Sequence, residues 1–197
     1  HLLGTDFHHW LVQQAVEGKW ALEDVADIVC RKNRDNQLIL ATLDEEHQKQ
    51  AAAFNQEKTI EVAHLMSAEF VLWLIEQAKE GNWSTEDVGS VVFRKNRDHT
   101  LVLATLDFET QKQVAFFNQE KTTEVAHLLG SEFHHWLVQQ TLEGKWSKED
   151  VVSVVCRKTR DNQLVLATLD EETQKQAAVF NKEKTISAVP YMAADFL

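Results

Sequence analysis

The chain has 197 residues, of which 44% are hydrophobic and 26% are charged, with six glycines and one proline. These proportions are typical of a folded globular protein and argue against the collagen-like, disordered and disulfide-scaffold classes. The net charge of −11 argues against general nucleic-acid binding, because attraction to phosphates supplies most of its non-specific affinity. The apolar run at residues 70–75 is far shorter than the roughly 20 residues of a membrane-spanning helix, so we expect no transmembrane segment.

The sequence repeats with a gapless period, so that 1–63, 64–126 and 127–189 are three copies of one pattern. The first and third copies agree at 46 of 63 positions, whereas the second copy agrees with each of them at 39 of 63, so the outer copies are the closer pair. We therefore treat each copy as one repeat unit, and the units alternate as A-B-A. We expect residues 190–197 to be the truncated or capping start of a fourth unit.

Each copy is expected to begin with an amphipathic helix. At the start of the third copy, the stretch from Val125 to Glu143 carries apolar residues at helical spacing, and Gly144 follows as a stop signal. We expect the preceding helix, from Asp107, to continue directly into this one, with any break falling between Asn118 and Thr123.

A second helix is predicted after the recurring turn that contains Trp146. Ser147 is a capping residue, and the two acidic residues that follow in the first turn favour the positive end of the helix dipole. Ser84 takes the same position in the second copy. The first copy has Ala21 there, which should cost that helix about 1 kcal/mol.

The third segment of each unit is ambiguous, because residues 38–43 and their equivalents fit either a buried strand or the start of a helix. In the third copy, a helix capped by Asp161 or Asn162 is favoured over a β-hairpin that turns at residues 159–162. A further helix is expected from Asp170 onward. The sequence therefore predicts an all-α tandem array of about three helices per unit, shaped as a rod or solenoid.

Histidine pairs in the first and third copies are replaced by apolar residues in the second copy. Exchange of this kind favours a half-buried helix face over a coordination shell, so we expect neither a metal site nor a cofactor. The residues concerned are His8, His9, His134 and His135, with Val71 and Leu72 in the second copy.

The two cysteines, Cys30 and Cys156, are expected to be small buried hydrophobic residues and not a disulfide pair. Cys30 with His47 or His8 would form a nucleophile–base pair, but the second copy keeps neither member, and no glycine-rich oxyanion loop is present. We therefore expect no enzymatic activity. The sequence does not indicate a cellular compartment.

A basic segment recurs after the second helix of every copy. Its structural role would be to complement the negative C-terminal end of that helix. Its functional role would be a ladder of basic patches for an acidic or phosphorylated protein partner. The residues of this ladder are Arg31, Lys32, Arg34, Arg94, Lys95, Arg97, Arg157, Lys158 and Arg160.

All six tryptophans fall on two positions of the period. They are expected to anchor the core of each unit, and the alternative is that they line a pocket for a lipid or another apolar small molecule. The first position holds Trp10, Trp73 and Trp136, and the second holds Trp20, Trp83 and Trp146. We accordingly expect a protein-binding or scaffold module, with a carrier of apolar ligands or a structural spacer rod as alternatives.

Overall fold

The computed structural model describes residues 4–188, and all the regular structure within them is helical. This confirms the predicted all-α class. The α-helices are α1 Thr5–Val16, α2 Leu22–Val29, α3 Glu45–Phe54, α4 Gln56–Val62, α5 Ala68–Lys79, α6 Thr85–Val92, α7 Phe108–Ala115, α8 Gln119–Val125, α9 Ser131–Leu142, α10 Lys148–Val155, α11 Glu171–Ala178 and α12 Lys182–Ala188. Short 3-10 helices lie at Leu40–Thr42 (η1), Ala63–Leu65 (η2), Val102–Thr105 (η3), Ala126–Leu128 (η4) and Val165–Thr168 (η5). None of the described helices combines the length and apolarity that crossing a membrane requires.

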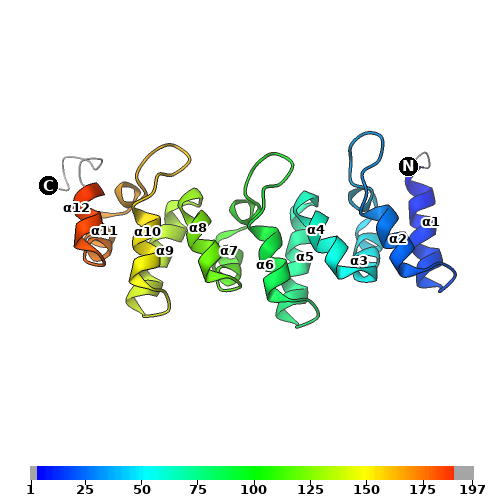
Figure 1. The fold of residues 1–197 in the computed structure, drawn as a ribbon, viewed down its shortest axis with the longest axis horizontal. Helices are drawn as coiled ribbons and strands as arrows, with labels where there is room; N and C mark the ends of the chain where they lie inside the picture. Colours follow the sequence, from blue (N-terminus) through cyan, green and yellow to red (C-terminus); the bar gives the residue numbers. More distant parts are fainter. Residues whose placement is uncertain (1–3, 189–197) are drawn as a thin grey trace. The chain divides into compact units, whose positions relative to one another are not determined.

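The chain divides into two compact units, His1–Thr105 and Leu106–Leu197. The first contains α1 to η3 and the second contains α7 to α12 (Figure 1). The boundary between them falls inside the second sequence copy, and the division into three repeat units stays a prediction. Residues 190–197, expected to begin a fourth unit, lie outside the described part of the chain.

The first helix of each copy ends at a glycine in the left-handed conformation. Gly144 has φ 78°, its N–H donates to the Thr141 carbonyl at 3.0 Å, and the Lys145 N–H donates to the Gln140 carbonyl at 2.9 Å. These bonds satisfy carbonyls that the last turn of a helix leaves free. Gly18 and Gly81 take the same conformation, so the predicted stop signal is confirmed.

The predicted caps of the second helices are present. The Ser84 hydroxyl accepts from the Asp87 N–H at 3.2 Å, and Ser147 accepts from the Asp150 N–H at 3.1 Å. Ala21 occupies the same position before α2 and provides no side-chain bond.

The expectation of one continuous helix into residue 143 is wrong in one respect. A break does occur at Asn118, as predicted, because its side chain accepts from the Lys121 N–H at 2.9 Å and starts a new helix. A second break follows η4, at Gly130, whose extended backbone precedes α9. Gly130 was the signal in the sequence that the expectation of a continuous helix overlooked.

The ambiguous third segment is neither of the predicted alternatives. Lys158 and Leu164 form one isolated antiparallel bridge, closed by Asn162 at φ 61°, and a 3-10 helix then covers Val165–Thr168. The turn of the hairpin is therefore present without its strands. No side chain caps the 3-10 helix, and the predicted helix from Asp170 begins at the next residue.

Of the histidines that alternate with apolar residues, His8 and His134 are buried, whereas His9 and His135 are half-buried. His8 and His134 are 5% and 1% exposed, and Val71 at the same position of the period is 2% exposed. The His134 Nε2–H donates to the Ala126 carbonyl at 2.8 Å, while its buried Nδ1 has no hydrogen-bond partner among the described residues. Burial lowers the pKa of His134 below its ordinary value of 6.5.

We predict that replacing Ala21 with Ser raises the free energy of unfolding by about 1 kcal/mol, because the hydroxyl would cap α2 as Ser84 caps α6. Urea unfolding followed by circular dichroism measures the change. The matched control, Ser84→Ala, should lower stability by a similar amount. Equal stability of Ala21→Ser and the wild type would contradict this account of the cap.

The buried His134 predicts a dependence of stability on pH. Since its folded-state pKa is lowered, the unfolded chain binds the proton more readily, and the stability present above about pH 6.5 is lost as the pH falls below it. His134→Val, which introduces the residue of the second copy, should flatten the fall in stability between about pH 7.5 and pH 5.5. Urea unfolding across this range checks it, and an unchanged slope would count against the role of His134.

Candidate functional site

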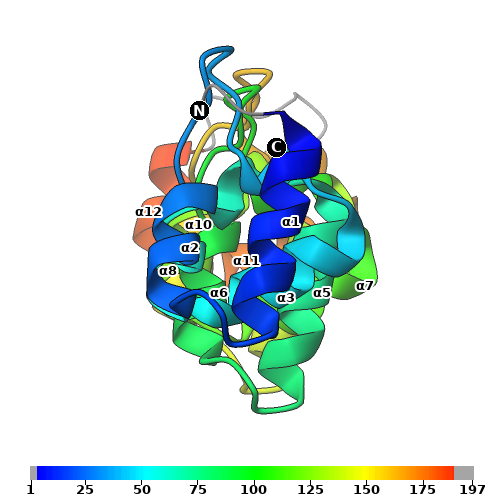
Figure 2. The same cartoon turned by 90° about the vertical axis from the view of Figure 1, so that its right-hand side faces the viewer.

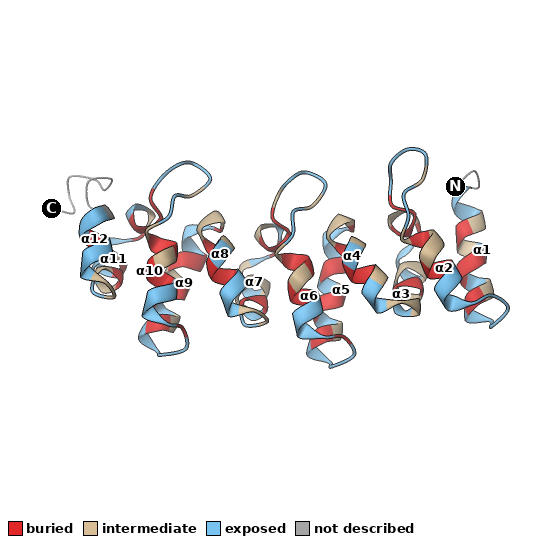
Figure 3. Ribbon diagram, viewed as in Figure 1, coloured by how far each residue is buried: buried red, intermediate tan, exposed pale blue. Residues whose placement is uncertain are grey.

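The nine residues of the predicted ladder are all exposed or half-buried and lie in three loops, residues 31–37, 94–100 and 157–163, which we call the basic loops. In the compact unit His1–Thr105, the loops at 31–37 and 94–100 project from the same side of the helices (Figures 1 and 2). Figure 3 shows that the residues of these loops are largely exposed, in contrast to the buried residues of the helices.

Each basic loop is held in one shape by its own hydrogen bonds. In the first loop, the Asn33 side chain accepts from the backbone N–H groups of Asp35 and Gln37, both at 3.0 Å. Asn96 makes the same pair of bonds in the second loop. A residue at φ near 60° closes each loop: Asn36, His99 and Asn162. The loops therefore present their basic side chains from a defined backbone.

The first arginine of a basic loop binds the short helix of the preceding copy. Arg94 donates to the Glu61 carbonyl of α4 at 2.9 Å, and Arg157 donates to the Glu124 carbonyl of α8 at 2.7 Å. Carbonyls in the last turn of a helix lack partners within that helix, so a guanidinium satisfies them well. The sequence predicts these arginines at the end of the helix before their own loop, whereas their hydrogen bonds go to carbonyls of α4 and α8.

The other end of each short helix is tied to the same neighbour. Gln56 Nε2 donates to the Asn82 carbonyl, just before α6, and Gln119 Nε2 donates to the Lys145 carbonyl, just before α10, both at 3.2 Å. The helix α4 is thus held at both ends by the segments that flank α6. The predicted site residues do not include these glutamines, although both stand at one position of the period, directly after a capping Asn.

The exposed fraction of the side chains on the short helices differs according to whether a further second helix, such as α6 or α10, follows them. Ile60 of α4 is 8% exposed and Thr123 of α8 is 7% exposed, whereas Ile186, at the same position of α12, is 71% exposed. The short helix α4 is followed by α5 and α6, and α8 is followed by α9 and α10. No such pair of helices follows α12 among the described residues.

The first copy shows the surface that such a helix would cover. A pocket of about 380 Å³ lies between α1, α2 and the first basic loop. Phe7 and Ile28 in its lining are half-buried, whereas Phe70 and Val91, their equivalents in the second copy, are fully buried. The pocket is lined by Phe7, His8, Leu11, Ile28, Arg31, Lys32, Asn33, Arg34 and Ile39.

The tryptophans form one edge-to-face pair in each copy. The ring centroids lie 6.2 Å apart for the first pair, 6.1 Å for the second and 6.3 Å for the third. The lining of the 380 Å³ pocket contains no tryptophan. Trp20 is 43% exposed, whereas Trp83 and Trp146 are buried. Trp10 is also exposed, and Trp73 and Trp136 are half-buried, so the exposed pair is that of the first copy.

The cysteine considered as a nucleophile is in an unreactive environment. Both cysteines are free and half-buried, and burial raises the pKa of the Cys30 thiol to about 11. At neutral pH such a thiol holds very little of the thiolate that attacks substrates. Nδ1 of His47, the base considered with it, lies 2.8 Å from both carboxylate oxygens of Asp44.

Comparison of the chain with protein-family models, with curated proteins and with solved structures finds no match.

We predict that the arginine of a basic loop stabilises the fold, whereas its lysine does not. Arg94→Met keeps the aliphatic stem but removes the bond to Glu61, and should lower the free energy of unfolding by about 1–2 kcal/mol. The matched change Lys95→Met should alter it by less than about 0.5 kcal/mol. Urea unfolding of both variants tests the difference, and equal losses would show that Arg94 has no special role.

Proposed function

We propose that the chain is a non-enzymatic tandem-repeat module that binds protein partners through a patch present in every copy. In this proposal, the three repeat units stack as a solenoid and each unit contributes a basic loop. The first copy adds the helix surface beside its loop, which a short helix covers in the other two copies. The shared loop conformation and the recurring bonds of Arg94 and Arg157 support this arrangement. A single unit of this size would bury too little surface to be very stable, and stacking would remedy that.

The observation that carries the proposal is the pocket beside the first basic loop, which no described part of the chain fills. The short helix α4 lies against α6 and accepts a hydrogen bond from Arg94. In the same way, α8 lies against α10 and accepts one from Arg157. In the first copy, Arg31 lines the pocket instead. Trp10, Trp20 and Leu22 are each more than 40% exposed on the same pair of helices and the turn between them. Apolar surface of this kind typically marks an interaction site.

The chemistry of the pocket defines the partner. The partner presents a short helix that places an apolar or β-branched side chain between Phe7 and Ile28, since Ile60 and Thr123 are the buried residues at one position of the chain's own short helices. Its last carbonyls accept from Arg31. Exposed Lys32 and Arg34 favour a partner helix with acidic residues near this end. The net charge of the chain is negative, so the basic loops are local exceptions that act within about 10 Å.

A peptide of residues 54–66, which contains the chain's own short helix, tests the pocket. We expect it to bind the whole chain with a dissociation constant of about 0.1–1 mM, because a short peptide must pay for its own ordering. The measurement is a titration followed by ¹⁵N–¹H NMR, with shifts expected at Phe7, Ile28 and Arg31. A peptide that carries Ile60→Asp is the matched control and should not bind.

The same titration separates the alternative functions. A carrier of apolar ligands would not bind the peptide but would bind a fluorescent fatty acid, with quenching of tryptophan emission. A spacer would bind neither probe. An Arg31→Met variant should bind the peptide more weakly than the wild type. Binding that is unaffected by this change and by Ile60→Asp would contradict the proposed function.

A further inference from the structure

Two histidines and an aspartate from different helices converge in the first copy. His9 lies on α1, Asp44 is the capping residue before α3, and His47 lies in the first turn of α3. His9 Nε2 is 3.4 Å from an Asp44 carboxylate oxygen, and His47 Nδ1 is 2.8 Å from the other. One nitrogen from each imidazole and one carboxylate oxygen all lie within 4.8 Å of one another.

The carboxylate is fixed in place and ionised. Asp44 accepts from the His47 backbone N–H at 3.0 Å, and this bond, followed by the one from the His47 side chain, holds the pKa of Asp44 below its ordinary value. Its side chain is 53% exposed, and those of His9 and His47 are 27% and 23% exposed. Water therefore reaches all three groups.

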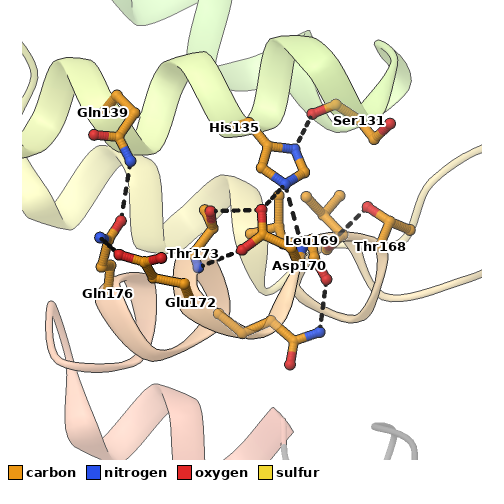
Figure 4. A network of polar contacts seen from close by, with 11 residues as sticks. Ser131, His135, Gln139, Thr168, Leu169, Asp170, Glu172, Thr173 and Gln176 are labelled. Atoms are coloured by element: carbon orange, nitrogen blue, oxygen red, sulfur yellow. Dashed lines mark hydrogen bonds and ion pairs between the residues drawn. The ribbon is translucent and has the colours of Figure 1, made fainter.

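The third copy is a natural control for this cluster, as Figure 4 shows. His135 Nε2 lies 2.6 Å from an Asp170 oxygen, which repeats the pairing of His9 with Asp44. The position of His47 is taken by Thr173, whose hydroxyl donates to Asp170 at 3.0 Å. The second copy has Leu72, Asp107 and Thr110 at the three positions. Two imidazoles are thus present only at the first-copy position of this cluster.

We propose that His9, Asp44 and His47 bind a divalent transition-metal ion, with zinc as the reference ion. Two imidazole nitrogens and one carboxylate oxygen suit zinc and its neighbours in the first transition row, whereas magnesium and calcium prefer oxygen ligands throughout. Three protein ligands leave a fourth tetrahedral position, which water fills from the exposed side.

Binding exchanges two existing hydrogen bonds for metal–nitrogen bonds. His47 Nδ1 releases the proton that it shares with Asp44, and His9 Nε2 gives up the bond that it accepts from the Asp44 backbone N–H at 3.1 Å. The ion then ties α1 to the start of α3 within the first unit. The exchange of His9 for Leu72 in the second copy predicts no metal site, and the other two ligands lie 35 or more positions further along the chain, at the start of another helix.

The test is isothermal titration of the whole chain with zinc ions, supported by the visible absorption spectrum of the cobalt-loaded protein. His47→Thr introduces the residue of the third copy, which keeps the cap because a threonine hydroxyl also donates to the aspartate. This variant should bind one zinc ion fewer, or bind it at least about tenfold more weakly. The converse change, Thr173→His, should add one zinc site to the third copy.

His99→Asn is the matched control, because it removes an exposed histidine and introduces the residue that the other two basic loops have. It should bind zinc as the wild type does. Equal zinc stoichiometry and affinity in wild type and His47→Thr would overturn the proposal. Absence of a new site in Thr173→His would also contradict it, since the same three residue types would then be in place without binding.

Discussion

The rest of the structure depends on the burial of each short helix, α4 or α8, against the second helix of the next copy, α6 or α10. The helix α4 contacts both α2 and α6, and Gln56 and Arg94 bond its two ends to the segments around α6. A helix as short as α4 has almost no stability by itself, so its formation requires these contacts. The same contacts bury the surface that the first copy leaves open. Cohesion within each unit and the open pocket therefore have one physical origin.

The copies differ most informatively where their surroundings differ. The buried position held by His8 and His134 accepts Val71 in the second copy, and the neighbouring position that bears His9 and His135 accepts Leu72. At the start of α3 and its equivalents, the cap itself is constant as Asp44, Asp107 and Asp170, while the residue three positions later is either His or Thr. Such substitutions keep the helices unchanged and alter only the chemistry that a copy displays. The first copy can thus differ in function from the third.

Local signals in the sequence predicted the helices better than they predicted the site. The serine caps and the stop at Gly144 depend on residues a few positions apart, and these predictions were confirmed. The break at Gly130 was missed because helical periodicity was followed through a glycine. The tight loop before Val165 matched neither alternative, because one bridge and a 3-10 turn leave no periodic pattern. The contacts of Arg94 with Glu61 and of His9 with Asp44 join residues more than 30 positions apart, which spacing along the chain does not reveal.

Hydrogen exchange of the whole chain measures the central interaction most directly. The account predicts that backbone amides of α4 and α8 exchange slowly, because a following second helix covers each of them. The amides of α12 should exchange much faster, although four of its seven residues match those of α4, because Ile186 has no such cover among the described residues. Equal protection of α12 and α4 would show that the short helix is stable without its neighbour, and would contradict the account.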